Sequence, residues 1–205
     1  ASVSAAPMLG DWIRDAHDAQ RSSLAEIPGV QLLAEAPGTA QGPGPAVLRT
    51  TVRDLVAAPE ALLEECFGPT AVVVEYDELA ELPDVLALVT GSLTGTVHGE
   101  QDELVELRPV VTALRLIAGR LVWNGWPTGV RVSWAMNHGG PWPASTVPSS
   151  TSVGAAGIRR FLRPVAYQDA PQDLLPPALR NINVLDIPRR IDGALTHDDV
   201  AQELS

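Results

Sequence analysis

The turn at residues 65–69 reads Glu-Cys-Phe-Gly-Pro and places the carboxylate of Glu65 two residues before the aromatic ring of Phe67. An apolar, β-branched run at 70–76 follows, which predicts a buried strand. Loops that enter a buried sheet often carry binding groups, because the rigid sheet fixes the direction of their side chains. The residue types therefore make this turn a candidate binding site, although they specify no particular ligand.

Cys66 is the only cysteine in the chain. A single cysteine excludes an internal disulfide and any site built from several cysteines around zinc or an iron–sulfur cluster. It could act as a nucleophile, but no nearby pattern supplies the base that would activate it. We therefore favour a small, partly buried side chain for Cys66 and expect no catalytic residue here. A reduced, cytoplasmic setting fits this cysteine usage.

The histidines show no metal-binding pattern. His17 and His197 stand among acidic residues without the spacing of metal ligands, and His98 ends a predicted strand in a structural or exposed role. We therefore expect no metal site.

Composition narrows the class of protein. The chain has 205 residues, 45% of them hydrophobic, and a net charge of −11, which indicates a folded domain and argues against nucleic-acid or anionic-membrane partners. No apolar run is long enough to span a membrane. All 14 basic residues are Arg, so the chain has neither the lysine of a Walker P-loop nor a Schiff-base lysine. A GC-rich genome would also explain this preference for Arg.

Strand and helix patterns alternate along the chain. The expected strands lie at 30–33, 46–52, 70–76, 93–98 and 120–124, and the main expected helices at 8–27, 79–89 and 104–118. This order predicts an α/β fold of βαβ units, with a largely parallel sheet and helices on both of its faces.

The rest of the chain is less regular. Residues 125–151 form a long Gly-, Pro- and Trp-rich segment, which favours a functional loop. A strand is expected at 161–168, at a sheet edge because Pro164 lacks an amide hydrogen. We expect residues 1–168 to form one domain, and the Pro- and Asp-rich residues 169–205 to form a surface tail.

The motif Glu-x-Phe-Gly-Pro resembles a signature of the aldehyde dehydrogenase superfamily. Further strings, in the same order, resemble its α-ketoglutarate (2,5-dioxovalerate) semialdehyde dehydrogenase branch. These strings lie at 93–99, 118–130, 135–141, 151–154 and 160–168.

The resemblance implies the C-terminal part of a catalytic domain from an enzyme that oxidises a small semialdehyde with NAD or NADP. In this family, Glu65 would bind the nicotinamide ribose hydroxyls and Phe67 would pack beside that ribose. The family's Cys nucleophile, its Glu base and its dinucleotide-binding domain have no counterpart in this chain. Gly42-Pro43-Gly44, for example, lacks a third glycine. The chain alone is therefore expected to be inactive and to bind no cofactor.

Three other residues are weaker candidates. The resemblance places His138 near a substrate tunnel, and Trp126 and Trp142 could form walls of the same pocket, although both rings could equally fill loop space. The resemblance also implies a homo-oligomer through the segment from Phe161 to Gln168. The rival hypothesis is a stand-alone interaction or oligomerisation module without chemistry. Glu65 would then be a solvated turn residue.

Overall fold

The structure is a computed structural model that describes residues 5–40 and 42–201. The chain forms two compact units, the first ending at Arg160 and the second beginning at Phe161. The helices are α1 (Asp11–Glu26), α2 (Val52–Ala57), α3 (Pro59–Leu63), α4 (Leu82–Leu86) and α5 (Arg108–Ile117). The strands are β1 (Gln31–Glu35), β2 (Ala46–Thr51), β3 (Thr70–Glu75), β4 (Ser92–Val97), β5 (Ala118–Trp123), β6 (Arg189–Ile191) and β7 (Ala194–Thr196). Short 3₁₀ helices lie at Leu79–Glu81, Gln101–Glu103, Ala155–Phe161, Gln172–Leu174 and Pro177–Leu179.

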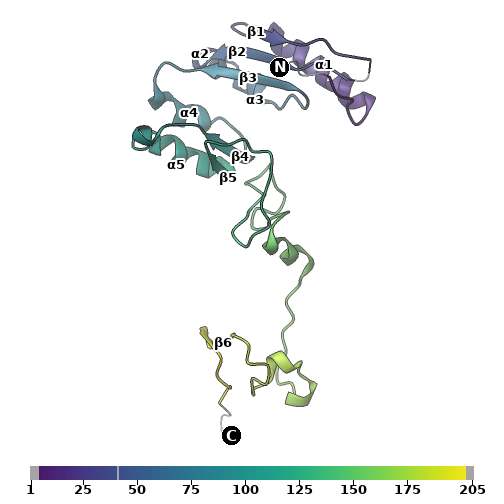
Figure 1. Cartoon of the computed structure of the whole chain (residues 1–205), viewed down its shortest axis with the longest axis vertical. Coiled ribbons are helices and arrows are strands. Elements are labelled where there is room, and N and C mark those ends of the chain that lie inside the picture. Colours follow the sequence, from purple (N-terminus) through teal and green to yellow (C-terminus); the bar gives the residue numbers. More distant parts are fainter. Residues whose placement is uncertain (1–4, 41, 202–205) are drawn as a thin grey trace. The chain divides into compact units, whose positions relative to one another are not determined.

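The first sheet has the order β1-β2-β3, and β2 lies beside β3 in the same direction (Figure 1). Helices α2 and α3 connect these two strands, which gives the βαβ unit that the sequence predicts. Along β2, alternate side chains are buried, among them Leu48 and Thr50, as expected for a strand with one face on a core. The turn at 65–69 enters this sheet at the start of β3.

Four buried leucines form the core beneath this sheet: Leu24 of α1, Leu48 of β2, Leu55 of α2 and Leu62 of α3. Each contributes roughly 1.5–3 kcal/mol when fully buried. Cys66 is among the partly buried side chains that pack against this cluster. The core therefore supports the candidate turn directly.

The second sheet consists of the parallel strands β4 and β5, with α5 connecting them (Figure 1). Val110 and Leu114, one helical turn apart on α5, are buried. A Cβ on Gly95 of β4 would lie 3.0 Å from Leu114 Cδ2, so the helix packs closely against this strand. This is a second βαβ unit.

The sheet arrangement differs from the largely parallel sheet that we expected. The described strands form three small sheets, and the first is mixed because β1 pairs with β2 in antiparallel orientation. The connection at 36–45 is short, whereas a parallel crossover needs about a dozen or more residues. It turns back instead, and the Ala36 amide donates to the Pro45 carbonyl at 2.9 Å. Helices on both faces of one large sheet are therefore not observed.

The edge strand expected at 161–168 is not formed within this chain. The 3₁₀ helix Ala155–Phe161 ends in this segment, and the remaining residues have no strand partner among those described. Pro164 cannot donate to a neighbouring strand, and Phe161 is 87% exposed. The described residues 125–151 contain neither a helix nor a strand, and their expected role as a functional loop stays a prediction.

The second unit contains a β-hairpin that we did not predict. Asp192 and Gly193 both have positive φ, at 48° and 86°, and join β6 to β7 in a turn that favours an Asp-Gly pair. The Arg189 guanidinium donates to the backbone carbonyls of Arg180, Asn181 and Asp198. These bonds give the C-terminal segment internal structure. The expected domain boundary after residue 168 stays a prediction.

Candidate functional site

The turn that carries Glu65 and Phe67 connects α3 to β3 and is held by backbone hydrogen bonds. The Pro69 carbonyl accepts from the Ala46 amide at 2.9 Å, which links the turn to the first residue of β2. The Gly68 carbonyl accepts from the Thr70 amide at 2.8 Å. Both side chains therefore project from a backbone that is fixed to the start of two parallel strands.

Glu65 is exposed and has no hydrogen-bond or ion-pair partner among the described residues. Its side chain borders a hollow of about 540 Å³ together with Cys66, Phe67 and Thr70. It also borders a second hollow, of about 720 Å³, that includes Pro143 and residues of the α4–β4 connection. A free carboxylate at the wall of a hollow can accept hydrogen bonds from the hydroxyl groups of a ligand.

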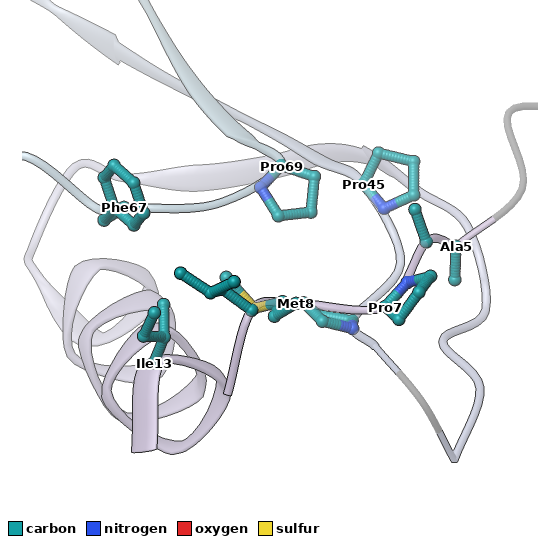
Figure 2. Close-up of a pocket in the computed structure, with 10 residues that line it drawn as sticks. Ala5, Pro7, Met8, Ile13, Pro45, Phe67 and Pro69 are labelled. Carbon is teal, nitrogen blue, oxygen red and sulfur yellow. The ribbon is translucent and has the colours of Figure 1, made fainter. Parts of the chain in front are cut away.

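Phe67 is 65% exposed and lies on one side of an apolar groove of about 470 Å³. Figure 2 shows Phe67 and Pro69 along one side, with Ile13, Met8 and Pro7 opposite them. A ring held in this way presents an apolar face to a ligand. Glu65 and Phe67 thus combine a hydrogen-bond acceptor and an apolar surface on one turn, which suits a polyhydroxylated group such as a ribose.

His17 of α1 lies directly beneath this turn and is only 1% exposed. Its Nε2 is 2.9 Å from Thr70 Oγ1, and its Nδ1 is 3.1 Å from Asp18 Oδ1. A Cβ on Gly68 would lie 2.3 Å from His17 Cδ2, so glycine is needed where the turn crosses the ring. The sequence analysis missed His17, because 53 residues separate it from Thr70 and no spacing signal joins them.

Cys66 has the surroundings of a structural cysteine. Its Sγ lies 3.9 Å from the His17 carbonyl oxygen. Burial raises the pKa of the thiol, and the nearby Thr70 hydroxyl opposes this effect to a smaller extent. A raised pKa disfavours the reactive thiolate. The interpretation of Cys66 as a partly buried side chain therefore fits its environment.

The three weaker candidates lie in the irregular loop and are not among the residues that line the hollows, although Pro143, next to Trp142, lines the larger hollow of Glu65. Trp126 is 80% exposed and its ring centroid is 5.7 Å from that of His98. Trp142 is 71% exposed and precedes a cis proline. None of the described residues lining the hollows of Glu65 and the groove of Phe67 is Trp126, His138 or Trp142. The structure does not bring the five candidates into one pocket.

Hydrogen bonds hold the backbone of His138 on both sides of the residue. Its amide donates to the buried Thr151 hydroxyl at 2.9 Å, and its carbonyl accepts from the Ser152 amide and hydroxyl at 3.1 and 2.9 Å. Its ring Nδ1 is buried without a partner among the described residues. The loop therefore fixes the His138 backbone and leaves one ring nitrogen free to bond.

Two structural findings concern other classes of site. No group of three or more His, Cys, Asp or Glu side chains in the described part of the chain is placed to hold a metal ion. Among residues 5–40 and 42–201, no helix combines the length and the apolar character needed to cross a membrane.

Known proteins resemble this chain in sequence and in fold. No protein-family model matches the chain. The chain is 44% identical over 195 residues to alpha-ketoglutaric semialdehyde dehydrogenase 2 of Azospirillum brasilense, which covers 94% of the chain and 37% of that protein. It is 42% identical over 144 residues to an alpha-ketoglutaric semialdehyde dehydrogenase of Acinetobacter baylyi, which covers 70% of the chain and 27% of that protein.

A solved structure shows the same fold. A point mutant of betaine aldehyde dehydrogenase from Staphylococcus aureus, in complex with NAD⁺, matches 76% of this chain and 30% of its own with a TM-score of 0.56 and 17% sequence identity. The chain thus spans about a third or less of the length of each of these proteins. The resemblance to the aldehyde dehydrogenase superfamily is confirmed: over most of its length, this chain is similar to about a third of an alpha-ketoglutaric semialdehyde dehydrogenase.

Proposed function

We propose that this chain is the C-terminal part of the catalytic domain of an NAD(P)-dependent aldehyde dehydrogenase that oxidises a small semialdehyde to a carboxylic acid. The observation that carries the proposal is the 44% identity, over nearly the whole chain, to a protein named as an alpha-ketoglutaric semialdehyde dehydrogenase. A cytoplasmic location belongs to the same proposal, because the lone Cys66 carries a free thiol.

In this proposal Glu65 and Phe67 bind the nicotinamide ribose. When bound, the nicotinamide accepts hydride from the substrate. The Glu65 carboxylate is exposed and unpartnered among the described residues, so it can accept hydrogen bonds from the two ribose hydroxyls without first breaking another contact. The exposed Phe67 ring would cover the apolar side of the sugar. Together they orient the ribose, and orientation of reactants is a large part of catalysis.

His138 and the two tryptophans are proposed to face the aldehyde from the irregular loop. The free His138 Nδ1 could accept or donate one hydrogen bond to a polar substrate group. Trp126 and Trp142 would supply apolar walls. Since these side chains do not line the hollows beside Glu65, their role is argued from the loop alone.

The test is Glu65→Gln in the full-length product of the gene that encodes this chain. Loss of a charged acceptor to hydroxyl groups costs roughly 1.5–3 kcal/mol, so hydride transfer should slow by about 10- to 100-fold. Glu26→Gln removes the same charge from an exposed position that lines neither hollow and should leave the kinetics unchanged. Equal rates for wild type and Glu65→Gln would return Glu65 to the role of a solvated turn residue.

The rival proposal, a stand-alone interaction module, predicts a different result in the same experiment. A full-length gene product that neither binds a nicotinamide cofactor nor oxidises any semialdehyde would favour it. The exposed apolar side chains of Phe161, Leu162 and Val165 provide the surface that such a module would use.

A further inference from the structure

We infer that His17 is a positioning residue that fixes the direction in which the turn presents Glu65 and Phe67. This inference rests on the proposed function, because it assigns His17 a role toward the same bound ribose. His17 itself touches no ligand in this scheme. It acts through Thr70 and Gly68.

The starting point is the freedom of the Glu65 side chain. No described residue bonds to its carboxylate, so its position is determined by the backbone from which it projects. That backbone is short, running from the end of α3 at Leu63 to the start of β3 at Thr70. Whatever fixes this backbone therefore also directs the carboxylate.

His17 contacts the turn at three places. Its Nε2 lies 2.9 Å from Thr70 Oγ1, its ring lies under Gly68 so closely that a Cβ there would come within 2.3 Å, and its backbone carbonyl lies 3.9 Å from Cys66 Sγ. Helix α1 thus makes its polar contacts with this segment through His17.

The chemistry of the contacts gives the ring a fixed orientation. A carboxylate oxygen only accepts hydrogen bonds, so in the neutral ring Nδ1 carries the proton and donates to Asp18. Nε2 then accepts from the Thr70 hydroxyl. Both ring nitrogens are partnered and the ring is 1% exposed. A buried polar group whose hydrogen bonds are all made is held in one geometry. An apolar ring of similar size would lack these bonds, so the plane of that ring could shift.

The experiment measures cofactor affinity and turnover of the full-length gene product for Thr70→Val, Thr70→Ser and Thr50→Val. Valine removes the hydroxyl with little change in shape, and serine restores it. Thr50 of β2 is the matched control, because it is buried in the same sheet and its hydroxyl has no partner among the described residues. The probes are NADH and NADPH, whose fluorescence reports binding without turnover.

We expect Thr70→Val to weaken binding of the reduced cofactor by about 2- to 10-fold, the range for one lost hydrogen bond, and to lower kcat. Thr70→Ser should recover most of the loss, and Thr50→Val should match the wild type. In a Glu65→Gln background, Thr70→Val should cost less than in the wild type, because the carboxylate that it misplaces is already gone and only the Phe67 contact remains to be lost. Additive losses in the double variant would overturn the inference.

A second measurement does not depend on the cofactor. NMR of the protein with labelled histidine and phenylalanine rings should show the Nδ1–H tautomer at His17, and Thr70→Val should shift both the His17 and the Phe67 signals. An unchanged Phe67 signal would show that the turn does not depend on the His17–Thr70 pair, and would overturn the inference. Loss of activity in Glu65→Gln with normal behaviour of Thr70→Val would overturn it while leaving the proposed function intact. Failure of the wild type to bind either cofactor would overturn both.

Discussion

At the scale of single residues, the candidate site depends on which side chains are partnered and which are free. Glu65 is free at the surface, while Cys66, the next residue, packs against the core. His17 is partnered on both sides of its ring. One short turn therefore brings together a side chain that is available to a ligand and side chains that hold the turn in place.

The raised pKa of the Cys66 thiol gives a prediction on its reactivity. Burial is the main cause of the shift, so alkylation by iodoacetamide at about pH 8, near the ordinary thiol pKa, should be several-fold slower in the folded chain than in the urea-unfolded chain. The pH midpoint of the alkylation rate should also be higher in the folded chain than in the unfolded chain. This shift distinguishes a raised pKa from simple shielding, which would slow the reaction at every pH without moving the midpoint. A folded midpoint at or below the unfolded one would contradict the assignment.

The raised pKa of the Cys66 thiol also makes the stability of the folded chain depend on pH in a defined direction. The folded-state pKa is above the unfolded one, so the folded chain prefers the protonated thiol. The stabilisation that the thiol contributes is fully present at pH values below its pKa in the unfolded chain and is lost as the pH rises through its pKa in the folded chain. Cys66→Ala should therefore reduce the pH dependence of the denaturation midpoint on the alkaline side. An unchanged pH dependence would show that the thiol does not contribute.

At the scale of elements, local patterns located the main strands and helices before residue 125, but not the β6–β7 hairpin or the pairing between distant strands. The apolar run at β3 and the helical spacing at α5 were found from the sequence, because their periodicity reflects burial. The antiparallel pairing of β1 depends on the short 36–45 connection, which the strand pattern alone does not reveal. His17 could not be found for a similar reason: a contact between α1 and the start of β3 leaves no periodic signal.

The irregular loop is attached to β5 by a close backbone contact at Gly119. A Cβ there would lie 1.8 Å from the Gly139 carbonyl oxygen, and Asn137 Nδ2 donates to the Gly119 carbonyl at 2.9 Å. Gly119→Ala should therefore destabilise the chain by about 1–3 kcal/mol or more, measured by urea denaturation. A methyl group on Gly129 would have no described atom within 4 Å, so Gly129→Ala is the matched control and should change stability little. Equal stability of the two variants would show that the loop is not attached at this point.

At the scale of the whole molecule, the proposed function gives the chain one part of a catalytic apparatus. It spans 37% of the length of its relative from Azospirillum brasilense, and the resemblance leads us to expect no counterpart of the family's nucleophile and base in it. The described residues also offer no activated thiol in their place, because Cys66 has a raised pKa. Catalysis through a covalent intermediate needs such a thiolate beside the aldehyde carbon.

The chain alone should therefore oxidise no aldehyde. The measurement is the absorbance of the reduced cofactor after incubation with NAD or NADP and a panel of small semialdehydes. Cys66→Ala is the control, since turnover by the wild-type chain above that of the variant would identify Cys66 as a nucleophile after all. Signal at the level of a blank without protein would agree with the prediction.

The isolated chain should self-associate through residues 161–168. Phe161, Leu162 and Val165 are 87%, 64% and 58% exposed, and extended backbone next to apolar side chains pairs readily with another chain. The net charge of −11 opposes association, but salt screens it beyond about 8–10 Å at physiological ionic strength. Light scattering at tens of micromolar should therefore show an oligomer.

A pair of double variants locates the contact. Leu162→Lys with Val165→Lys should give a monomer, because two buried ammonium groups would oppose pairing. Leu174→Lys with Leu195→Lys makes the same charge change at exposed leucines, 73% and 71% exposed, outside the segment and should leave the oligomer intact. A wild-type monomer would refute the association. If the oligomer persists in the Leu162→Lys, Val165→Lys variant, the contact lies outside residues 161–168. The same conclusion holds if the Leu174→Lys, Leu195→Lys variant is equally monomeric.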